Sequence, residues 1–157
     1  MLPEVTRILY ASDIQQGARP AFRTAVSLCG RYHSHITFLH VVEPVRGNAE
    51  RLVKTMMHED ASLQALHDDS LGKIRQQVRD RVERFCREEL AAETMLEQGQ
   101  LDVRIEEGTP WKTILAVADE MDASVIVMGV RHQKSLLGNT SSKVMHNSKR
   151  PVLVVPL

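Results

Sequence analysis

The chain has 157 residues, of which 43% are hydrophobic and 25% are charged. This length and composition suit one globular domain with a core of its own, so we expect residues 1–157 to form a single domain. Lysine plus arginine equal aspartate plus glutamate at 20 each, and this balance argues against nucleic acid or an anionic membrane as a partner. No window approaches the roughly 20 apolar residues that span a bilayer, and the N-terminus lacks leader features. We therefore expect a cytoplasmic protein.

Two apolar runs near the start of the chain predict buried strands. Residues 8–11 (ILYA) are followed at once by Ser12 and Asp13, and residues 36–42 (ITFLHVV) are rich in β-branched side chains. Between residues 18 and 29, apolar side chains recur at the three-and-four spacing of an amphipathic helix. The first part of the chain therefore predicts a strand, a helix and a second strand.

The side chains with metal-binding or redox chemistry are dispersed along the chain. Cys29 and Cys86 lie on separate predicted helices without a CxxC pattern or a nearby Cys/His cluster, so we interpret both as buried thiols rather than metal ligands or a disulfide. His40 lies within the second predicted strand, and we interpret it as a satisfied sheet histidine rather than a ligand. The sequence therefore predicts no metal site.

The segment from residue 46 to residue 100 is highly charged and helical in character. We expect a short helix over residues 48–57 and a longer helix over residues 61–90, whose apolar stripe includes Leu66, Ile74 and Val78. Its acidic and basic side chains alternate in sign, which indicates a solvated face.

The last third of the chain predicts three more strands. Residues 101–106 alternate apolar and charged side chains, which is typical of an edge strand with one wet face. Thr109 can cap a helix that has Pro110 in its first turn, and residues 125–128 (VIVM) form a continuous apolar run typical of a strand covered on both faces. A helix starting near Thr140 then precedes a fifth strand within PVLVVPL.

Alternating strands and helices predict a parallel sheet with helices on both faces, because each parallel crossover is right-handed and needs about a dozen residues. We expect an α/β, Rossmann-like fold with five strands in the order 3-2-1-4-5. Such sheets bind ligands at the carboxyl ends of their strands, where the strand order reverses. In this order the reversal lies between the first and the fourth strand.

Small and polar residues converge on this expected crevice. Ser12 and Asp13 end the first strand, and Gly129 ends the fourth strand, where glycine permits a turn or the close approach of a ligand. Residues 138–141 (GNTS) follow where a helix could begin, and the free N–H groups of a helix start favour phosphate. The alternative is that the glycines only punctuate loops, that one of the four residues only caps the helix, and that Asp13 only closes a strand.

Four blocks in register give the whole chain a resemblance to the universal stress protein family. They are ILYASD followed by an amphipathic helix, FLHVVEP, EGTPWKTILAVADEMDASVIVMG, and LLGNTSSKVMHNSKRPVLVVP. The resemblance implies a single domain with the adenine nucleotide α-hydrolase-like fold, commonly assembled as a homodimer. It also implies a role in stress adaptation and the binding of an adenine nucleotide, ATP or AMP, without a well-defined reaction.

The resemblance further implies which residues bind the nucleotide. The residues that correspond to the nucleoside contacts are Ala11, Ser12, Asp13, Val41 and Met128. The residues at or near the phosphate-binding motif are Gly129, His132, Gly138, Asn139, Thr140 and Ser141.

The chain departs from the family's phosphate-binding pattern, which is GxxG, nine residues, then Gly and Ser or Thr. His132 stands where the second glycine belongs, only five residues separate it from Gly138, and Asn139 replaces the hydroxyl residue. A ring at position 132 and a shorter loop should weaken phosphate binding. Cationic donors from Arg131, His132 and Lys134 can replace some of the lost amide contacts.

Three functions follow from these features. A nucleotide-binding regulatory module is favoured by the convergence of Asp13, Gly129 and the turn over residues 138–141. An interaction protein with a vestigial cleft is favoured by His132, Asn139 and the short loop. An enzyme is disfavoured, because the chain contains no GxxxxGK[ST], no GxSxG and no carboxylate cluster that could hold magnesium.

The fifth strand predicts a homodimer. It is an edge strand in the expected order, yet its central residues are apolar without alternation: Val152, Leu153, Val154 and Val155. Pairing with its own copy about a two-fold axis would close this edge without forming a filament. The alternative is that the last helix and the adjoining loop shield the strand in a monomer.

Overall fold

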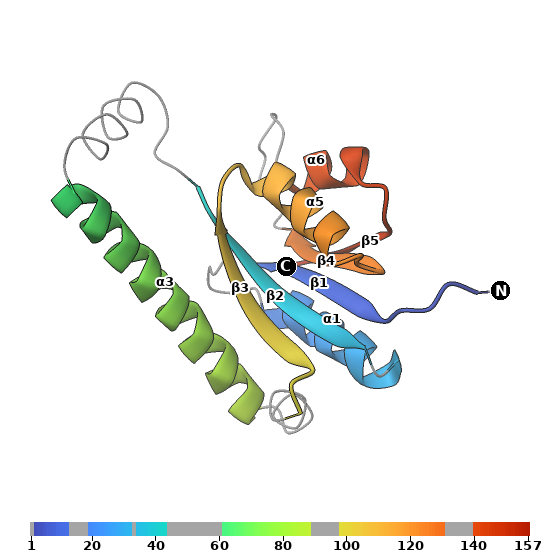
Figure 1. Cartoon of the computed structure of the whole chain (residues 1–157). Helices are drawn as coiled ribbons and strands as arrows, with labels where there is room; N and C mark the ends of the chain where they lie inside the picture. Colours follow the sequence, from blue (N-terminus) through green and yellow to red (C-terminus); the bar gives the residue numbers. More distant parts are fainter. Residues whose placement is uncertain (1, 13–18, 33, 44–60, 89–97, 131–139) are drawn as a thin grey trace.

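The computed structural model describes residues 2–12, 19–32, 34–43, 61–88, 98–130 and 140–157. In chain order its elements are β1 (Arg7–Ser12), α1 (Arg19–Tyr32), β2 (His35–Val42), α3 (Ala61–Glu88), β3 (Leu101–Glu107), α5 (Pro110–Glu120), β4 (Val125–Val130), α6 (Thr140–Asn147) and β5 (Val152–Pro156). The five strands form one parallel sheet in the order β3-β2-β1-β4-β5 (Figure 1). The predicted fold class and strand order are therefore confirmed, while the helix expected over residues 48–57 lies outside the described residues.

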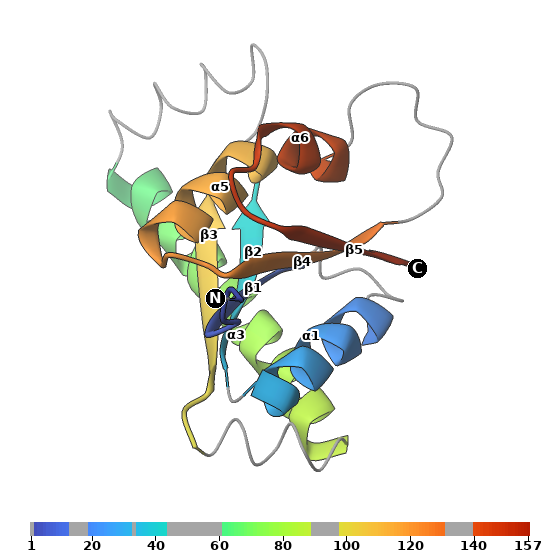
Figure 2. The same cartoon turned by 90° about the vertical axis from the view of Figure 1, so that its right-hand side faces the viewer.

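Helices cover both faces of the sheet. Figure 2 shows α5 and α6 on one face and α1 and α3 on the other. Ile8, Leu9 and Tyr10 of the central strand are each at most 1% exposed, because successive side chains of a strand point to opposite faces and here both faces are covered. The continuous apolar runs in the sequence arise from this double coverage.

An aromatic cluster attaches α1 to the middle of the sheet. The rings of Tyr10 in β1, Phe38 in β2 and Phe22 in α1 have centroids 5.1 to 5.3 Å apart. Ring pairs at such distances stabilise a fold by about 0.5–1.5 kcal/mol each beyond the burial of their area. Val78 of α3 is fully buried in the same cluster. The layer of α1 and α3 is thus held on one side of β1 and β2.

A second apolar cluster holds α5 and α6 on the opposite face. Its buried members are Leu9, Leu39, Ile114, Val117, Ala118, Ala123, Ile126, Met128 and Val144. The helix α5 begins as the sequence predicts, with Pro110 in its first turn and Ile114 and Val117 directed inward. These contacts fix the start of α5 beside the carboxyl ends of β1 and β2.

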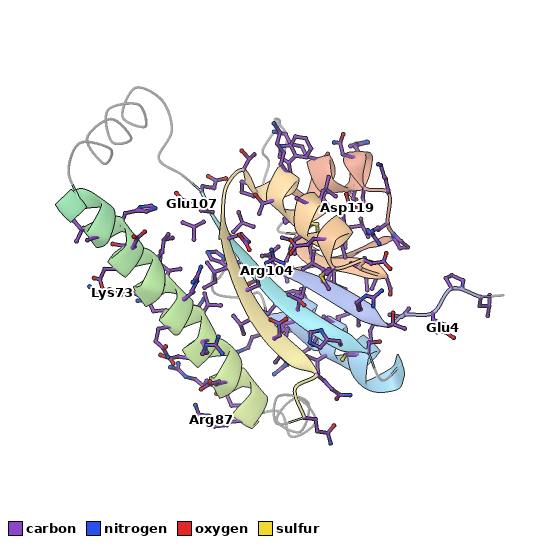
Figure 3. All side chains as sticks on the ribbon, viewed as in Figure 1. Glu4, Lys73, Arg87, Arg104, Glu107 and Asp119 are labelled. Atoms are coloured by element: carbon purple, nitrogen blue, oxygen red, sulfur yellow. The ribbon has the colours of Figure 1, made fainter. Side chains whose placement is uncertain are left out.

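The strand β3 is an edge strand with one wet face, as predicted. Leu101 and Ile105 are buried, whereas Arg104 lies on the other side of the strand and bonds two carboxylates. Its Nε donates to Glu106 Oε1 at 2.6 Å, and its Nη2 donates to Glu120 Oε2 at 2.8 Å. The hydrogen bond from Arg104 lowers the pKa of Glu120. The ion pair between Arg104, which is labelled in Figure 3, and Glu120 therefore ties this face of β3 to the end of α5.

Two local predictions are wrong in detail. Leu66 is 61% exposed and does not join the buried stripe of α3, which contains Ile74 and Val78. At 3.6 residues per turn, a residue eight positions before Ile74 lies about 80° away around the helix, so Leu66 lies beside the stripe and not on it. Thr109 occupies the N-cap position of α5 but makes no side-chain capping bond. Pro110 presets the helical φ angle at this position, and the helix begins there without the capping bond.

The prediction of a buried thiol at Cys29 is confirmed. The side chain is 1% exposed, and burial raises the pKa of the thiol to about 11. Its sulfur donates to the backbone carbonyl of Ser34 at 2.8 Å. A protonated, buried thiol is a poor nucleophile and a poor metal ligand. The side chain of Cys86 lies outside the described part of the chain.

A charged network joins the amino-terminal ends of the strands. Arg7 Nη2 donates to Asp122 Oδ2 at 2.8 Å, and Arg150 Nη1 donates to Asp122 Oδ1 at 2.9 Å. Arg150 also donates from Nε to Asp119 Oδ1 at 3.2 Å and from Nη1 to the carbonyl of Ala123 at 2.8 Å. The start of β1 and the residues before β5 are thus connected through the turn between α5 and β4.

We expect the contribution of this network to stability to depend on pH. Hydrogen bonds from Arg150 and then Arg7 hold the pKa of Asp122 below its ordinary value of 3.8. The stabilisation is therefore fully present above pH 3.8 and is lost as the pH falls through the lower pKa of the folded state. Asp122→Asn should melt below the wild type at neutral pH, with a difference that shrinks below pH 3.8.

Asparagine is the matched replacement, because Asp122 has a φ of 50° and asparagine tolerates that conformation. Thermal unfolding followed by circular dichroism across acidic and neutral pH measures the difference. A difference in melting temperature that stays constant below pH 3.8 would show that the charge of Asp122 does not act in this way.

Candidate functional site

The binding site expected from the sequence lies at the carboxyl edge of the sheet, where the register of β1 with β4 ends. The register of β1 with β4 ends at the pair Ala11 and Met128, whereas its register with β2 continues to Ser12. Gly129, the next residue of β4, is in register with Val155 of β5. The described pairing of the two central strands therefore ends at Met128, at the point where the strand order reverses. Open α/β sheets bind ligands at this position.

The structure describes seven of the residues that the sequence assigns to this site. Ala11 and Ser12 end β1, Val41 is near the end of β2, Met128 and Gly129 are near the end of β4, and Thr140 and Ser141 begin α6. The other four lie outside the described residues: Asp13, His132, Gly138 and Asn139.

The seven residues divide between the two faces of the sheet. Ala11, Val41 and Met128 belong to the apolar cluster under α5 and α6, and Met128 is only 5% exposed. Ser12 and Gly129 alternate with these positions and lie toward the face of α1. The residues expected to contact the nucleoside are thus an apolar group on the face of α5 and α6, with the polar end of β1 beside it.

Gly129 has a packing role that its position in the sequence does not reveal. A Cβ added to this glycine would lie 2.7 Å from Leu157 Cδ1 and 3.2 Å from Ala21 Cβ. Leu157 follows β5, and Ala21 is a fully buried residue of α1. The absence of a side chain at position 129 therefore allows α1 and the segment after β5 to approach β4.

We expect Gly129→Ala to destabilise the protein without any ligand present. The new methyl would overpack a filled space, which typically costs about 1–3 kcal/mol. The end of the Leu157 side chain can move, but Ala21 cannot, so we expect the lower half of that range. Urea unfolding measures the loss.

Leu157→Ala supplies the matched control for this substitution, because it removes the atoms that approach position 129 most closely. Gly129→Ala should cost less in the Leu157→Ala background than in the wild type. A stable Gly129→Ala protein that has lost nucleotide binding would instead assign the glycine to the ligand.

The first turn of α6 lies against the sheet at the same edge. Ser141 is 6% exposed, and Val144 on the same side of the helix is fully buried. Ser141 is therefore placed by the packing of α6 on the apolar cluster.

Two further residues at this edge were not assigned to the site from the sequence. His40, in register with Ser12, brings its Nδ1 to 3.1 Å from the backbone carbonyl oxygen of Ser12. Trp111, in the first turn of α5, packs in the same cluster as Ala11 and Val41. The periodicity of α5 predicts that Trp111 faces inward, but no local signal indicates that it is near the ends of β1 and β2.

The described residues include no group of three or more His, Cys, Asp or Glu side chains that could hold a metal ion. None of the described helices is both long and apolar enough to span a bilayer.

The strand order and the crevice between β1 and β4 define a doubly wound, Rossmann-like α/β protein. Residues 4–156 match the universal stress protein family. The chain therefore belongs to this family, as its sequence blocks predict.

Three similar proteins give this membership a context. The chain is 28% identical to the "Stress response protein NhaX" of Bacillus subtilis (strain 168), over 95% of this chain and 96% of that protein. It superposes on the universal stress protein UspA from Lactobacillus plantarum with a TM-score of 0.70 and 25% identity, over 97% of this chain and 98% of the other. A universal stress protein from Archaeoglobus fulgidus, solved in complex with dAMP, has a TM-score of 0.52 and 12% identity, with 98% of each chain covered.

Proposed function

We propose that this universal stress protein is a regulatory module of the stress response that binds an adenine nucleotide, ATP or AMP, in the crevice between β1 and β4. The observation that carries the proposal is the end of the register between these strands at Ala11 and Met128, where the strand order reverses. Ala11, Val41 and Met128 place apolar side chains at this point, beside the polar end of β1. An apolar wall with a few polar groups suits a nucleoside.

A similar protein supports the class of ligand. The Archaeoglobus fulgidus universal stress protein was solved with dAMP, which contains adenine, a pentose and one phosphate. The nucleoside half of the crevice in this chain keeps the expected residues at the ends of β1, β2 and β4. The phosphate half carries His132, a short loop and Asn139. We therefore infer that the nucleoside provides most of the binding free energy.

One observation favours a second function, an interaction protein whose crevice no longer binds nucleotide. Gly129 is the one glycine of the family's phosphate motif that lies within the described residues. The close packing of Leu157 and Ala21 is enough to explain why this position has no side chain. If packing is its only role, this glycine gives no support to a ligand. In either case we propose a regulatory and not a catalytic role, in a homodimer formed through β5.

The single tryptophan offers a direct test of nucleotide binding. Trp111 shares a packed cluster with Ala11 and Val41, so a nucleoside against those residues should change the fluorescence of its indole. We expect a saturable change on titration with AMP and no such change with ribose 5-phosphate, which lacks the base. If millimolar AMP has no effect and denatured protein releases no nucleotide by mass spectrometry, the second function replaces the first.

A further inference from the structure

Trp111 lies in the first turn of α5, at the edge of the sheet where we place the nucleotide. The strand β3 ends at Glu107 and α5 begins at Pro110, so two residues connect them. The backbone N–H of Gly108, in this connection, donates to the carbonyl oxygen of Val42 at 3.0 Å. This bond holds the start of α5 beside the last residue of β2.

The apolar cluster under α5 and α6 extends toward this edge through Trp111. Because α5 leads from the carboxyl end of β3 back to the start of β4, its first residues lie nearest the carboxyl ends of the strands (Figure 1). One turn further along α5, Ile114 is 4% exposed and belongs to the cluster, as does Leu39 of β2. Val41 follows Leu39 on the same face of the sheet. Trp111 and Val41 therefore extend the cluster toward the same edge, one from the helix and one from the strand.

The cluster does not fully enclose Trp111. This residue is half-buried, whereas Ile114, Val117 and Ala118 further along α5 are each at most 4% exposed. The Nζ of Lys112 lies 5.5 Å from the centroid of the indole ring, within the range of cation–π attraction. Such an attraction is weak at an exposed residue, and Lys112 is exposed. An aromatic ligand can therefore take the place of the ammonium group on the ring.

We propose that Trp111 stacks on the nucleobase and thereby gives the site a preference for purine over pyrimidine nucleotides. The residues at the strand ends, Ala11, Val41 and Met128, offer a base an apolar surface without an aromatic ring. Trp111 supplies the ring, and stacking on an aromatic side chain strengthens with the size of the base, since a purine has two fused rings and a pyrimidine has one. This inference rests on the proposed function, and it names the residue that selects the base.

Three variants separate stacking from packing. Trp111→Phe retains an aromatic ring, and Trp111→Leu retains an apolar side chain without one. Leu115→Ala is the control, because Leu115 packs against the same cluster one turn further along α5. Its loss should lower stability without removing a contact to the base. Thermal unfolding shows that each variant is folded before its affinity is measured.

Calorimetric titration with AMP and with CMP measures the preference. We expect the wild type to bind AMP about tenfold more tightly than CMP, and Trp111→Leu to lose about tenfold in AMP affinity, the scale of one stacked base. Trp111→Leu should also lose most of the preference for AMP over CMP, whereas Trp111→Phe should keep most of it. Leu115→Ala should leave the ratio of the two affinities unchanged.

Nuclear Overhauser contacts test the stacking without any substitution. The chain contains a single tryptophan, so every indole signal in the NMR spectrum belongs to Trp111. With AMP bound to the wild type, we expect contacts between the indole protons and the protons on C2 and C8 of adenine. Only a base that lies close to the ring produces them.

The outcomes distinguish this inference from the proposed function. If the wild type binds neither AMP nor CMP at millimolar concentration, the proposed function fails and the stacking role fails with it. If the wild type binds AMP but shows no contact between indole and adenine, the nucleotide site stands and the role of Trp111 in it is wrong. The same conclusion follows if Trp111→Leu keeps the wild-type preference for AMP over CMP.

Discussion

Leu153→Lys is expected to convert a homodimer into a soluble monomer. Val152 and Val154 pack on the cluster under α5 and α6, and Val155 packs on the opposite cluster with α1. Only Leu153 among these residues remains exposed, at 36%. The described helices therefore cover part of both faces of β5. They leave Leu153 and the outer edge of this edge strand uncovered. A lysine there would remove an apolar contact and place like charges near each other across a two-fold axis.

Light scattering coupled to size-exclusion chromatography measures the result. Leu66→Lys is the matched control and should stay dimeric. Leu66 is 61% exposed on α3, which contacts β3 at the opposite edge of the sheet from β5. Val154→Lys and Val155→Lys should also yield monomers, although both side chains pack within their own chain and their loss also costs stability. A monomeric wild type would contradict the homodimer, and a dimeric Leu153→Lys protein would place the interface away from β5.

Asp13→Ala is expected to weaken adenine nucleotide binding by about 1.5–3 kcal/mol, the scale of a hydrogen bond to a charged group. Asp13 follows the last residue of β1 and lies outside the described residues. We assign its carboxylate to the ribose hydroxyls or to adenine. The melting temperature of the ligand-free protein should change little, because the expected contact exists only with nucleotide bound.

Asp119→Ala provides a control carboxylate at the opposite end of the strands. Asp119 is paired with Arg150 near the start of β5, so its loss should leave nucleotide affinity unchanged. Calorimetric titration of both variants compares the two positions. If Asp13→Ala binds nucleotide as tightly as the wild type, Asp13 serves only to close the turn after β1.

Most of the fold could be predicted from the sequence because its signals are local. The apolar run over residues 8–11, the alternation over residues 101–106 and the Pro110 helix start each correspond to one element. The crossover rules predict a parallel sheet, whereas its strand order was predicted by placing the first strand at the centre and the fourth strand beside it. Leu66 is the exception, because it lies at the edge of a helical stripe and a count of apolar residues does not give its angle to the sheet.

The candidate site could be predicted only as a set of strand ends. The sequence places Ala11, Ser12 and Gly129 at one edge, and the structure agrees. It could not indicate that Leu157 fills the space beside Gly129, or that His40 bonds the Ser12 carbonyl. Both contacts join residues 28 positions apart in the sequence, and local patterns contain no information about such pairs.

Calorimetric titration of the wild-type protein with AMP and with ATP tests the central claim most directly. We expect both nucleotides to bind, with ATP favoured by no more than about tenfold, a difference of 1.4 kcal/mol, because the shortened loop with His132 and Asn139 adds few phosphate contacts. The absence of heat with either nucleotide at millimolar concentration would contradict a nucleotide site between β1 and β4.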